Sequence, residues 1–327
     1  MQKILRQPRI YLLLSTLVLF CNALHAQEPY PNRPVRMIVP FAPGGGIDIL
    51  GRTLGQKLSE RWKQGVVIEN RSGASGAIGT ELAAKSPADG YTLLMSVNTI
   101  VMVPGLNKKT AYDPVKDFAP VAPVAIGRLS LVTHPSLNVK SVGEFVALAK
   151  KEPGKLAYGS PGNGTPHHLS MELFKQRMGV DVLHVPYKGS DGFLNGILAR
   201  QTQAVFMPIH QALAQVNAGR LSMLSAGGTR RSSVTPNVPS LAEASGIRDI
   251  DVDMWYAMYL PAGTPRDLVM RINADINAVL KLPDLIDTLG KQGLSPTGGT
   301  PEELAEITRN DLERWSRVIR DAGIKAD

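Results

Sequence analysis

Three consecutive glycines, Gly44, Gly45 and Gly46, end a loop that begins at Pro40 and lies between an apolar run and a helical pattern. Unhindered backbone N–H groups at the start of a helix bind carboxylates and other anions without a charged side chain. A tight turn is the alternative, but one glycine would suffice for it. We therefore expect this loop to contact a ligand. Asp48, in the first helical turn, is expected to stabilise the helix.

A second loop, residues 160–165, repeats this design and adds hydroxyl groups at its two ends, on Ser160 and Thr165. Each hydroxyl could donate to a carboxylate or cap the following helix. The two roles are compatible, and the residues alone do not choose between them. Asn98 and Thr99 follow another apolar run and offer similar donors.

Motifs of common enzymes are absent from the chain. It has no G-x-x-x-x-G-K-[ST], H-E-x-x-H or G-x-S-x-G, and the triple glycine lacks the further glycine that G-x-G-x-x-G requires. His167 and His168 are adjacent, and adjacent side chains on a helix point about 100° apart, so we expect roles at a helix start rather than metal binding. We predict no catalytic residue, no metal, no cofactor and no enzymatic activity.

The first 26 residues have the layout of a secretory signal peptide: basic residues, a short apolar run and small residues before a cleavage site after Ala26. Removal of this segment takes away the only cysteine, Cys21, and lowers the formal charge from +8 to +5. No run of Lys or Arg exceeds two residues, so no nucleic-acid surface is expected. The pattern predicts an exported, soluble protein.

The elements that must position the loops alternate between strand and helix. Apolar runs predict strands at 35–39, 66–70, 91–96, 129–133, 155–159, 182–186, 204–207, 221–225 and 251–260. Helical spacing and capping residues predict helices at 47–62, 77–85, 141–151, 168–178 and 191–199, and two more after Thr264 and Thr300. Such alternation predicts an α/β fold with largely parallel sheets and helices on both faces. In such sheets the glycine loops lie at the carboxyl ends of strands, where ligands bind.

The mature chain resembles the tripartite tricarboxylate transporter receptors, the TctC or Bug periplasmic solute-binding proteins, over essentially its whole length. The resemblance rests on ordered motifs: Y-P-N-R-P at 30–34, V-P-F-A-P-G-G-G at 39–46, V-I-E-N-R at 67–71, A-D-G-Y-T-L-L at 88–94, D-F-A-P-V at 117–121, G-S-P-G-N-G at 159–164, V-P-Y-K-G at 185–189, N-V-P-S at 237–240 and P-A-G-T-P at 261–265. Many motifs in order make it specific.

The resemblance implies a two-domain, type II-like Venus flytrap fold that binds a small organic mono- or dicarboxylate in its cleft. The first domain would comprise residues 27–124 plus 227–327, and the second residues 125–226. The loops that match the family's binding loops supply the candidate ligand contacts: Phe41, Ala42, Gly44, Gly45, Gly46, Asn98, Thr99, Ser160, Gly162, Asn163, Gly164 and Thr165. The expected partners are membrane transporter subunits or, alternatively, a sensor kinase, and the protein is expected to be monomeric. A secreted enzyme that acts on a carboxylated substrate is the alternative from another class.

Met207 is a further candidate ligand contact, because many relatives have an acidic residue near this position. Met207 and Pro208 would present apolar surface, and a buried ammonium group would lack an anionic partner there. This departure predicts a carboxylate ligand with an apolar body rather than an amino acid. The alternative is that Met207 lies under the sheet and never meets the ligand.

Overall fold

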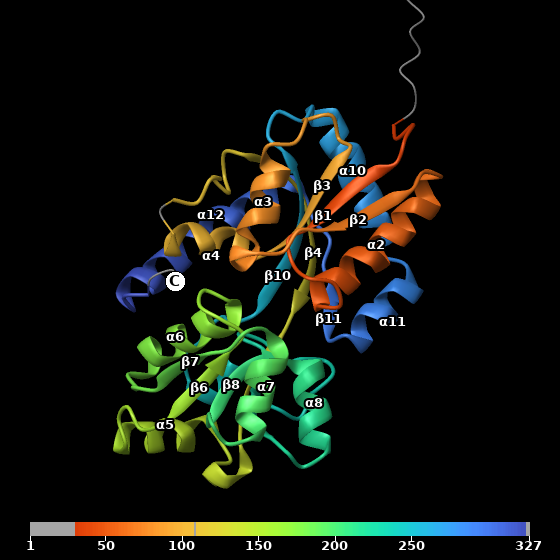
Figure 1. Cartoon of the computed structure of the whole chain (residues 1–327). Coiled ribbons are helices and arrows are strands. Elements are labelled where there is room, and N and C mark those ends of the chain that lie inside the picture. Colours follow the sequence, from red (N-terminus) through yellow and green to blue (C-terminus); the bar gives the residue numbers. More distant parts are fainter. Residues whose placement is uncertain (1–29, 108, 325–327) are drawn as a thin grey trace, which may run out of the picture. The chain divides into compact units, whose positions relative to one another are not determined.

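The computed structural model describes residues 30–107 and 109–324 (Figure 1). The expected signal peptide, residues 1–26, and its cleavage site lie outside the described residues. The chain divides into two units between Arg33 and Pro34, and every element below belongs to the second unit. In the part of the chain that the structure describes, no helix combines the length and the apolar character needed to cross a membrane.

The first sheet has six strands in the order β11-β4-β10-β3-β1-β2. Its members are β1 (Val35–Val39), β2 (Val66–Asn70), β3 (Thr92–Val97), β4 (Phe118–Gly127), β10 (Met254–Pro261) and β11 (Leu294–Pro296). β1 pairs in parallel with β2 and with β3, whereas β10 runs antiparallel to both β3 and β4. β1 is almost wholly buried and β3 wholly so, which explains why their sequences are mainly apolar.

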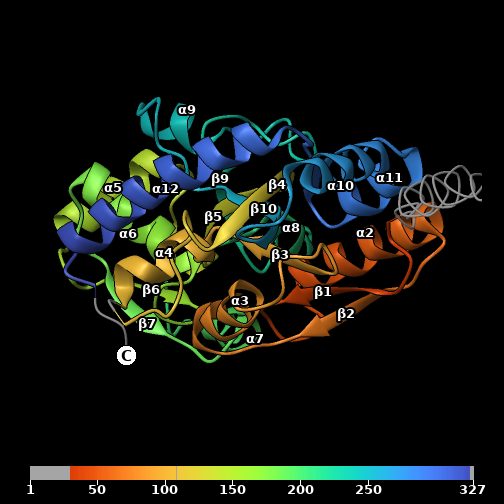
Figure 2. The same ribbon diagram turned by 90° about the horizontal axis from the view of Figure 1, so that it is seen from above.

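Helices cover this sheet on both faces. They are α2 (Gly46–Trp62), α3 (Ala77–Ala84), α4 (Thr99–Leu106), α10 (Arg266–Val279), α11 (Pro283–Lys291) and α12 (Pro301–Asp321), with a 3₁₀ turn, η1 (Ala74–Gly76), before α3. The β1–α2–β2 and β2–α3–β3 connections run in opposite directions along the sheet. Because such crossovers are right-handed, α2 and α3 lie on opposite faces. α2 contacts α10 and α11, whereas α3 contacts α4, and Figure 2 shows these two groups apart.

The second sheet has five strands in the order β7-β6-β8-β5-β9. They are β5 (Leu129–Thr133), β6 (Ala157–Ser160), β7 (Leu183–Pro186), β8 (Ala204–Pro208) and β9 (Ser222–Ala226). The accompanying helices are α5 (Val142–Lys151), α6 (Pro166–Met178), α7 (Ser190–Leu198), α8 (Ile209–Asn217) and α9 (Leu241–Ser245), with a 3₁₀ turn, η2 (Pro135–Leu137). β6 is parallel to β7 and β8, whereas β5 is antiparallel to β8 and β9.

The α/β class is confirmed, but both sheets are mixed rather than largely parallel. The antiparallel pairs all involve β5 or the strands β4, β10 and β11. β4 was not predicted, because Pro120 and Pro123 interrupt its apolar pattern and proline is disfavoured within strands. The structure accommodates them with register shifts in the β10–β4 pairing. α4, α8 and α11 were also not predicted.

Candidate functional site

Each sheet contains a point at which the direction of the chain's crossovers reverses. In the first sheet this point lies between the neighbouring strands β1 and β3, and in the second it lies between β6 and β8. Loops that follow two such strands diverge to opposite faces and leave room for a ligand at the carboxyl ends of the strands. The loops here are residues 40–45 and 161–165, with Asn98 after β3. The predicted donor segments thus lie at these two switch points.

A buried carboxylate holds the first loop in place. Asp48 accepts hydrogen bonds from Gly44 N–H at 2.9 Å, from Arg52 Nε at 2.9 Å and from Asn70 Nδ2 at 2.9 Å. Asn70 Nδ2 also donates to the Phe41 carbonyl oxygen at 3.0 Å. Burial opposes ionisation of Asp48, but these hydrogen bonds hold the pKa of its carboxyl below the usual value. Asp48 therefore orders the loop, and its own lone pairs are already used.

The backbone donors at the start of α2 remain available to a ligand. Gly45 is the N-cap residue, and in the described part of the chain no side chain caps this helix. The N–H groups of Gly46 and Ile47, in the first turn, have no intrahelical acceptor. Together with the partial positive charge of the helix start, they favour an anion.

Asn98 lies beside this loop, at the end of β3 and the N-cap of α4. Its side chain is 1% exposed, and neither its amide nitrogen nor its amide oxygen has a hydrogen-bond partner among the described residues. An unpaired buried amide of this kind costs about 1–3 kcal/mol. Native proteins pair nearly all buried polar groups, so we expect the Asn98 amide to bond with a partner from outside the chain. Thr99, the first residue of α4, is buried as well.

The second loop uses its hydroxyl groups internally. The Ser160 hydroxyl donates to the Gly162 carbonyl oxygen at 3.1 Å and lies 2.7 Å from His184 Nε2. The Thr165 hydroxyl donates to the same carbonyl oxygen at 2.8 Å and caps α6 by accepting from His168 N–H. Of the two roles open to these hydroxyls, the structure shows helix capping and hydrogen bonds within the loop.

Two stacked imidazole rings hold this second loop in place. The rings of His168 and His184 lie 3.9 Å apart at 7°, and His184 also stacks on Tyr158. His168 Nδ1 accepts a hydrogen bond from Gly164 N–H at 3.0 Å. Burial, with a smaller effect from Lys175, lowers the pKa of His168 to about 4, so the ring is neutral at pH 7. The sequence pattern offered no signal for this stack, because its members come from different elements.

His167, beside His168, is half-buried, and desolvation of its ring lowers its pKa to about 4. Among the described residues, no group of three His, Cys, Asp or Glu side chains could hold a metal ion.

Met207 does not lie where a ligand contact was predicted. Its side chain is 0% exposed and belongs to a hydrophobic cluster with Val132, Phe193, Ile197 and Ala212. Strand alternation places it on the face of β8 that α7 and α8 cover. This burial agrees with the alternative, that Met207 lies under the sheet and never meets the ligand, and it removes the reason that Met207 offered against an amino acid ligand.

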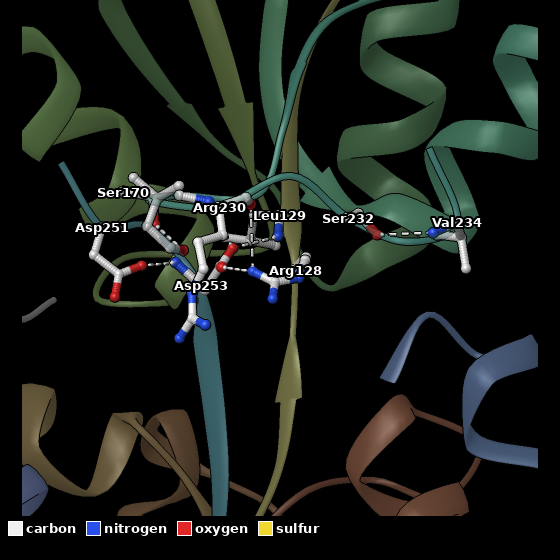
Figure 3. Close-up of polar contacts among 10 residues, drawn as sticks. Arg128, Leu129, Ser170, Arg230, Ser232, Val234, Asp251 and Asp253 are labelled. Atoms are coloured by element: carbon white, nitrogen blue, oxygen red, sulfur yellow. Dashed lines mark hydrogen bonds and ion pairs between the residues drawn. The ribbon is translucent and has the colours of Figure 1, made fainter. Parts of the chain in front are cut away.

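The chain passes between the sheets at β4–β5 and at β9–β10, and one buried ion pair joins the two passages (Figure 3). Asp253 accepts hydrogen bonds from Arg128 Nη1 at 2.8 Å, Leu129 N–H at 3.3 Å and Gly228 N–H at 3.0 Å. Burial and the nearby charge of Asp251 outweigh Arg128 and raise the pKa of Asp253 to about 7. No local sequence pattern indicates the pairing of Arg128 with Asp253, because the two residues lie 125 positions apart.

Contacts also join the loops of the two sheets. The Ser75 hydroxyl donates to the Asn163 carbonyl oxygen at 3.3 Å, across from η1 to the second loop. A Cβ atom on Gly164 would lie 2.0 Å from Leu106 Cδ1, at the end of α4. Gly164 therefore allows the second loop to approach the first sheet closely.

Comparison with known proteins agrees with this geometry. The curated relative BugT of Bordetella pertussis is 35% identical over 300 residues, which span 91% of this chain and 92% of BugT. An R. palustris protein solved with adipate is 34% identical with a TM-score of 0.81, over 90% of this chain and 99% of that one. MatC from Rhodopseudomonas palustris, solved with bound malate, is 27% identical with a TM-score of 0.77, over 89% of this chain and 100% of MatC.

The two mixed sheets with donor loops at their switch points define a periplasmic-binding-protein fold, on which solved periplasmic binding proteins superimpose. Residues 50–324 match the model of the tripartite tricarboxylate transporter family receptors, TctC. The chain belongs to this family of periplasmic solute-binding proteins, as the sequence motifs predicted.

Proposed function

We propose that this protein is a periplasmic receptor that captures a small organic carboxylate and delivers it to a tripartite tricarboxylate-type membrane transporter. The observation that carries the proposal is the buried, unpaired amide of Asn98 beside the uncapped start of α2. The amide N–H and the backbone N–H groups of Gly46 and Ile47 are donors that suit a carboxylate. The adipate and malate in the two solved relatives support this ligand class.

The receptor would consist of the two domains that the sequence motifs imply, residues 27–124 plus 227–327 and residues 125–226. The loop at 40–46 with Asn98 would bind the ligand from the first domain, and the backbone of residues 160–165 would bind it from the second. A ligand that contacts both loops binds the closed arrangement better than an open one, and so shifts the population toward closure. The closed form is the one that would be presented to the transporter, with no chemical change in the ligand.

Substitution of Asn98 by leucine tests the proposal, because stability and affinity should change in opposite directions. Leucine has a similar size and removes an unpaired polar group, so the free energy of unfolding without ligand should rise, by up to about 1–3 kcal/mol. The affinity for the ligand should fall about tenfold or more, since the donor is lost. Titration calorimetry with adipate and malate, and urea unfolding without them, measure the two effects.

Asn273, in helix α10 against strand β4 of the first sheet, provides a matched control. Its buried amide donates to the carbonyl oxygens of Val121 at 2.7 Å and Gly299 at 2.8 Å. Asn273→Leu should therefore lower the free energy of unfolding and leave the affinity unchanged. If wild-type protein binds no mono- or dicarboxylate in such a titration, the proposed ligand class is wrong. Uptake of a labelled ligand by cells with and without the receptor tests delivery to the transporter.

A further inference from the structure

Tyr256 lies at the same edge of the first sheet as the donors described above. It is the third residue of β10, which runs antiparallel to β3 and pairs Tyr256 with Val97, the last residue of β3. The start of β10 thus lies at the carboxyl ends of β3 and β1. The backbone N–H of Asn98 donates to the carbonyl oxygen of Trp255 at 3.2 Å, which fixes this neighbourhood.

The side chain of Tyr256 is only 5% exposed, and its hydroxyl group makes no hydrogen bond to another described residue, although its oxygen atom is not sealed from solvent. Buried tyrosine hydroxyls normally find a partner. The other buried tyrosines of the described chain follow this rule: Tyr112 donates to the Ile100 carbonyl oxygen, Tyr158 to Glu172, and Tyr259 bonds with Thr308. Packing of the ring alone would be served equally well by phenylalanine, so the hydroxyl calls for a separate explanation.

The position of the Tyr256 hydroxyl group supplies this explanation. It lies 3.7 Å from the point where a Cβ atom on Gly46 would stand, so it faces the first residue of α2. It also lies 3.4 Å from the corresponding point on Gly127, at the end of β4. Burial raises the pKa of Tyr256 above its usual value, so the group stays protonated and can donate. A protonated hydroxyl beside the free N–H groups of a helix start adds one more donor to an anion site.

We propose that Tyr256 contacts the ligand and donates a hydrogen bond from its hydroxyl to the carboxylate bound at the start of α2. The inference rests on the proposed function, and it adds a side-chain contact to a site otherwise built from backbone groups and the Asn98 amide. A ligand whose group at this position is neutral or cationic gains less from Tyr256 than a carboxylate does. Tyr256 is thus a determinant of specificity.

Tyr256→Phe tests the inference, with Tyr259→Phe as the control three residues along the same strand. Titration calorimetry of the mature protein with adipate and with malate should give a dissociation constant at least about tenfold higher for Tyr256→Phe. Its midpoint of thermal unfolding without ligand should equal or exceed that of the wild type, because no hydrogen bond within the protein is lost. Tyr259→Phe should bind normally and unfold at a lower temperature, because it loses the bond to Thr308.

The near-ultraviolet absorbance of tyrosine gives a second test, which does not depend on small differences in folding between the variants. Ligand addition should change the near-ultraviolet absorbance of tyrosine in the wild type and in Tyr259→Phe, and the change should be smaller in Tyr256→Phe. If the wild type binds and Tyr256→Phe binds equally well, Tyr256 is not a ligand contact, while the proposed function stands. If the wild type binds no carboxylate, both proposals fail.

Discussion

Replacement of Gly45 by valine tests whether the backbone of the first loop contacts the ligand. Gly45 has φ −78° and ψ 165°, an extended conformation that valine adopts readily. A Cβ atom there would meet only the carbonyl oxygen of Ala42, at 3.9 Å. The variant should therefore fold. Valine is a poorer N-cap than glycine, so the free energy of unfolding should fall by no more than about 1 kcal/mol.

The effect on binding should be larger. The new side chain stands next to the N–H groups of Gly46 and Ile47 and hinders the approach of a carboxylate. Loss of one hydrogen bond to a charged group costs about 1.5–3 kcal/mol. At 1.4 kcal/mol for each factor of ten, the dissociation constant should rise about tenfold to about a hundredfold.

Titration calorimetry with adipate and malate on the folded variant measures this rise. Gly143→Val is the matched control, because Gly143 lies in the first turn of α5 and a Cβ atom there would meet only Ser141 Oγ, at 3.9 Å. The control should bind as the wild type does. If Gly45→Val binds with unchanged affinity, the reasoning is refuted, and the three glycines serve only to form a turn.

Two further predictions concern the groups that support the site. Asp253→Ala should lower the free energy of unfolding at pH 8 by about 3–5 kcal/mol, because its buried partners lose their acceptor, whereas Asp249→Ala, at an exposed ion pair, should leave urea unfolding unchanged. The wild type should lose stability as pH falls from about 6.5 toward about 4, by up to about 1.4 kcal/mol per pH unit for each of His167 and His168, because the unfolded chain binds protons that these folded side chains exclude. His168→Gln keeps an acceptor for Gly164 N–H and should reduce this slope in urea unfolding at pH 5 and 7; an unchanged slope would show that His168 is not its source.

Much of the fold could be predicted from local patterns. The ranges 35–39 and 66–70 coincide with β1 and β2, because short runs rich in apolar and β-branched residues bounded by turn residues are typical of strands. The strand predicted at 251–260 corresponds to β10, which begins at Met254. Its direction could not be predicted, because pairing with β3 and β4 depends on contacts far away in the sequence. That direction is what brings Tyr256 to the carboxyl ends of β1 and β3, beside the start of α2.

The backbone segments of the candidate site could be predicted from the sequence, whereas its side chains could be predicted less well. Glycine loops at strand ends have a local signal, so the segments at both switch points were found. Met207 was misplaced, because a single sequence does not show which face of β8 is covered by helices. The stack of His168 on His184 and the pairing of Arg128 with Asp253 join separate elements and carry no local signal.

The unpaired groups of the site argue for a ligand more strongly than its shape does. Folding alone gains nothing from the unpaired amide of Asn98, since leucine would fill the same volume without the cost of desolvation. The hydroxyl of Tyr256 likewise makes no hydrogen bond to another described residue, and phenylalanine would pack as well. Asp48 and the second-loop hydroxyls differ, because their bonds within the chain already account for them. Both unpaired groups stand at one edge of one sheet, beside the start of α2. A carboxylate at that point would accept hydrogen bonds from both, and its binding would offset the free-energy cost of leaving them unpaired in the folded chain.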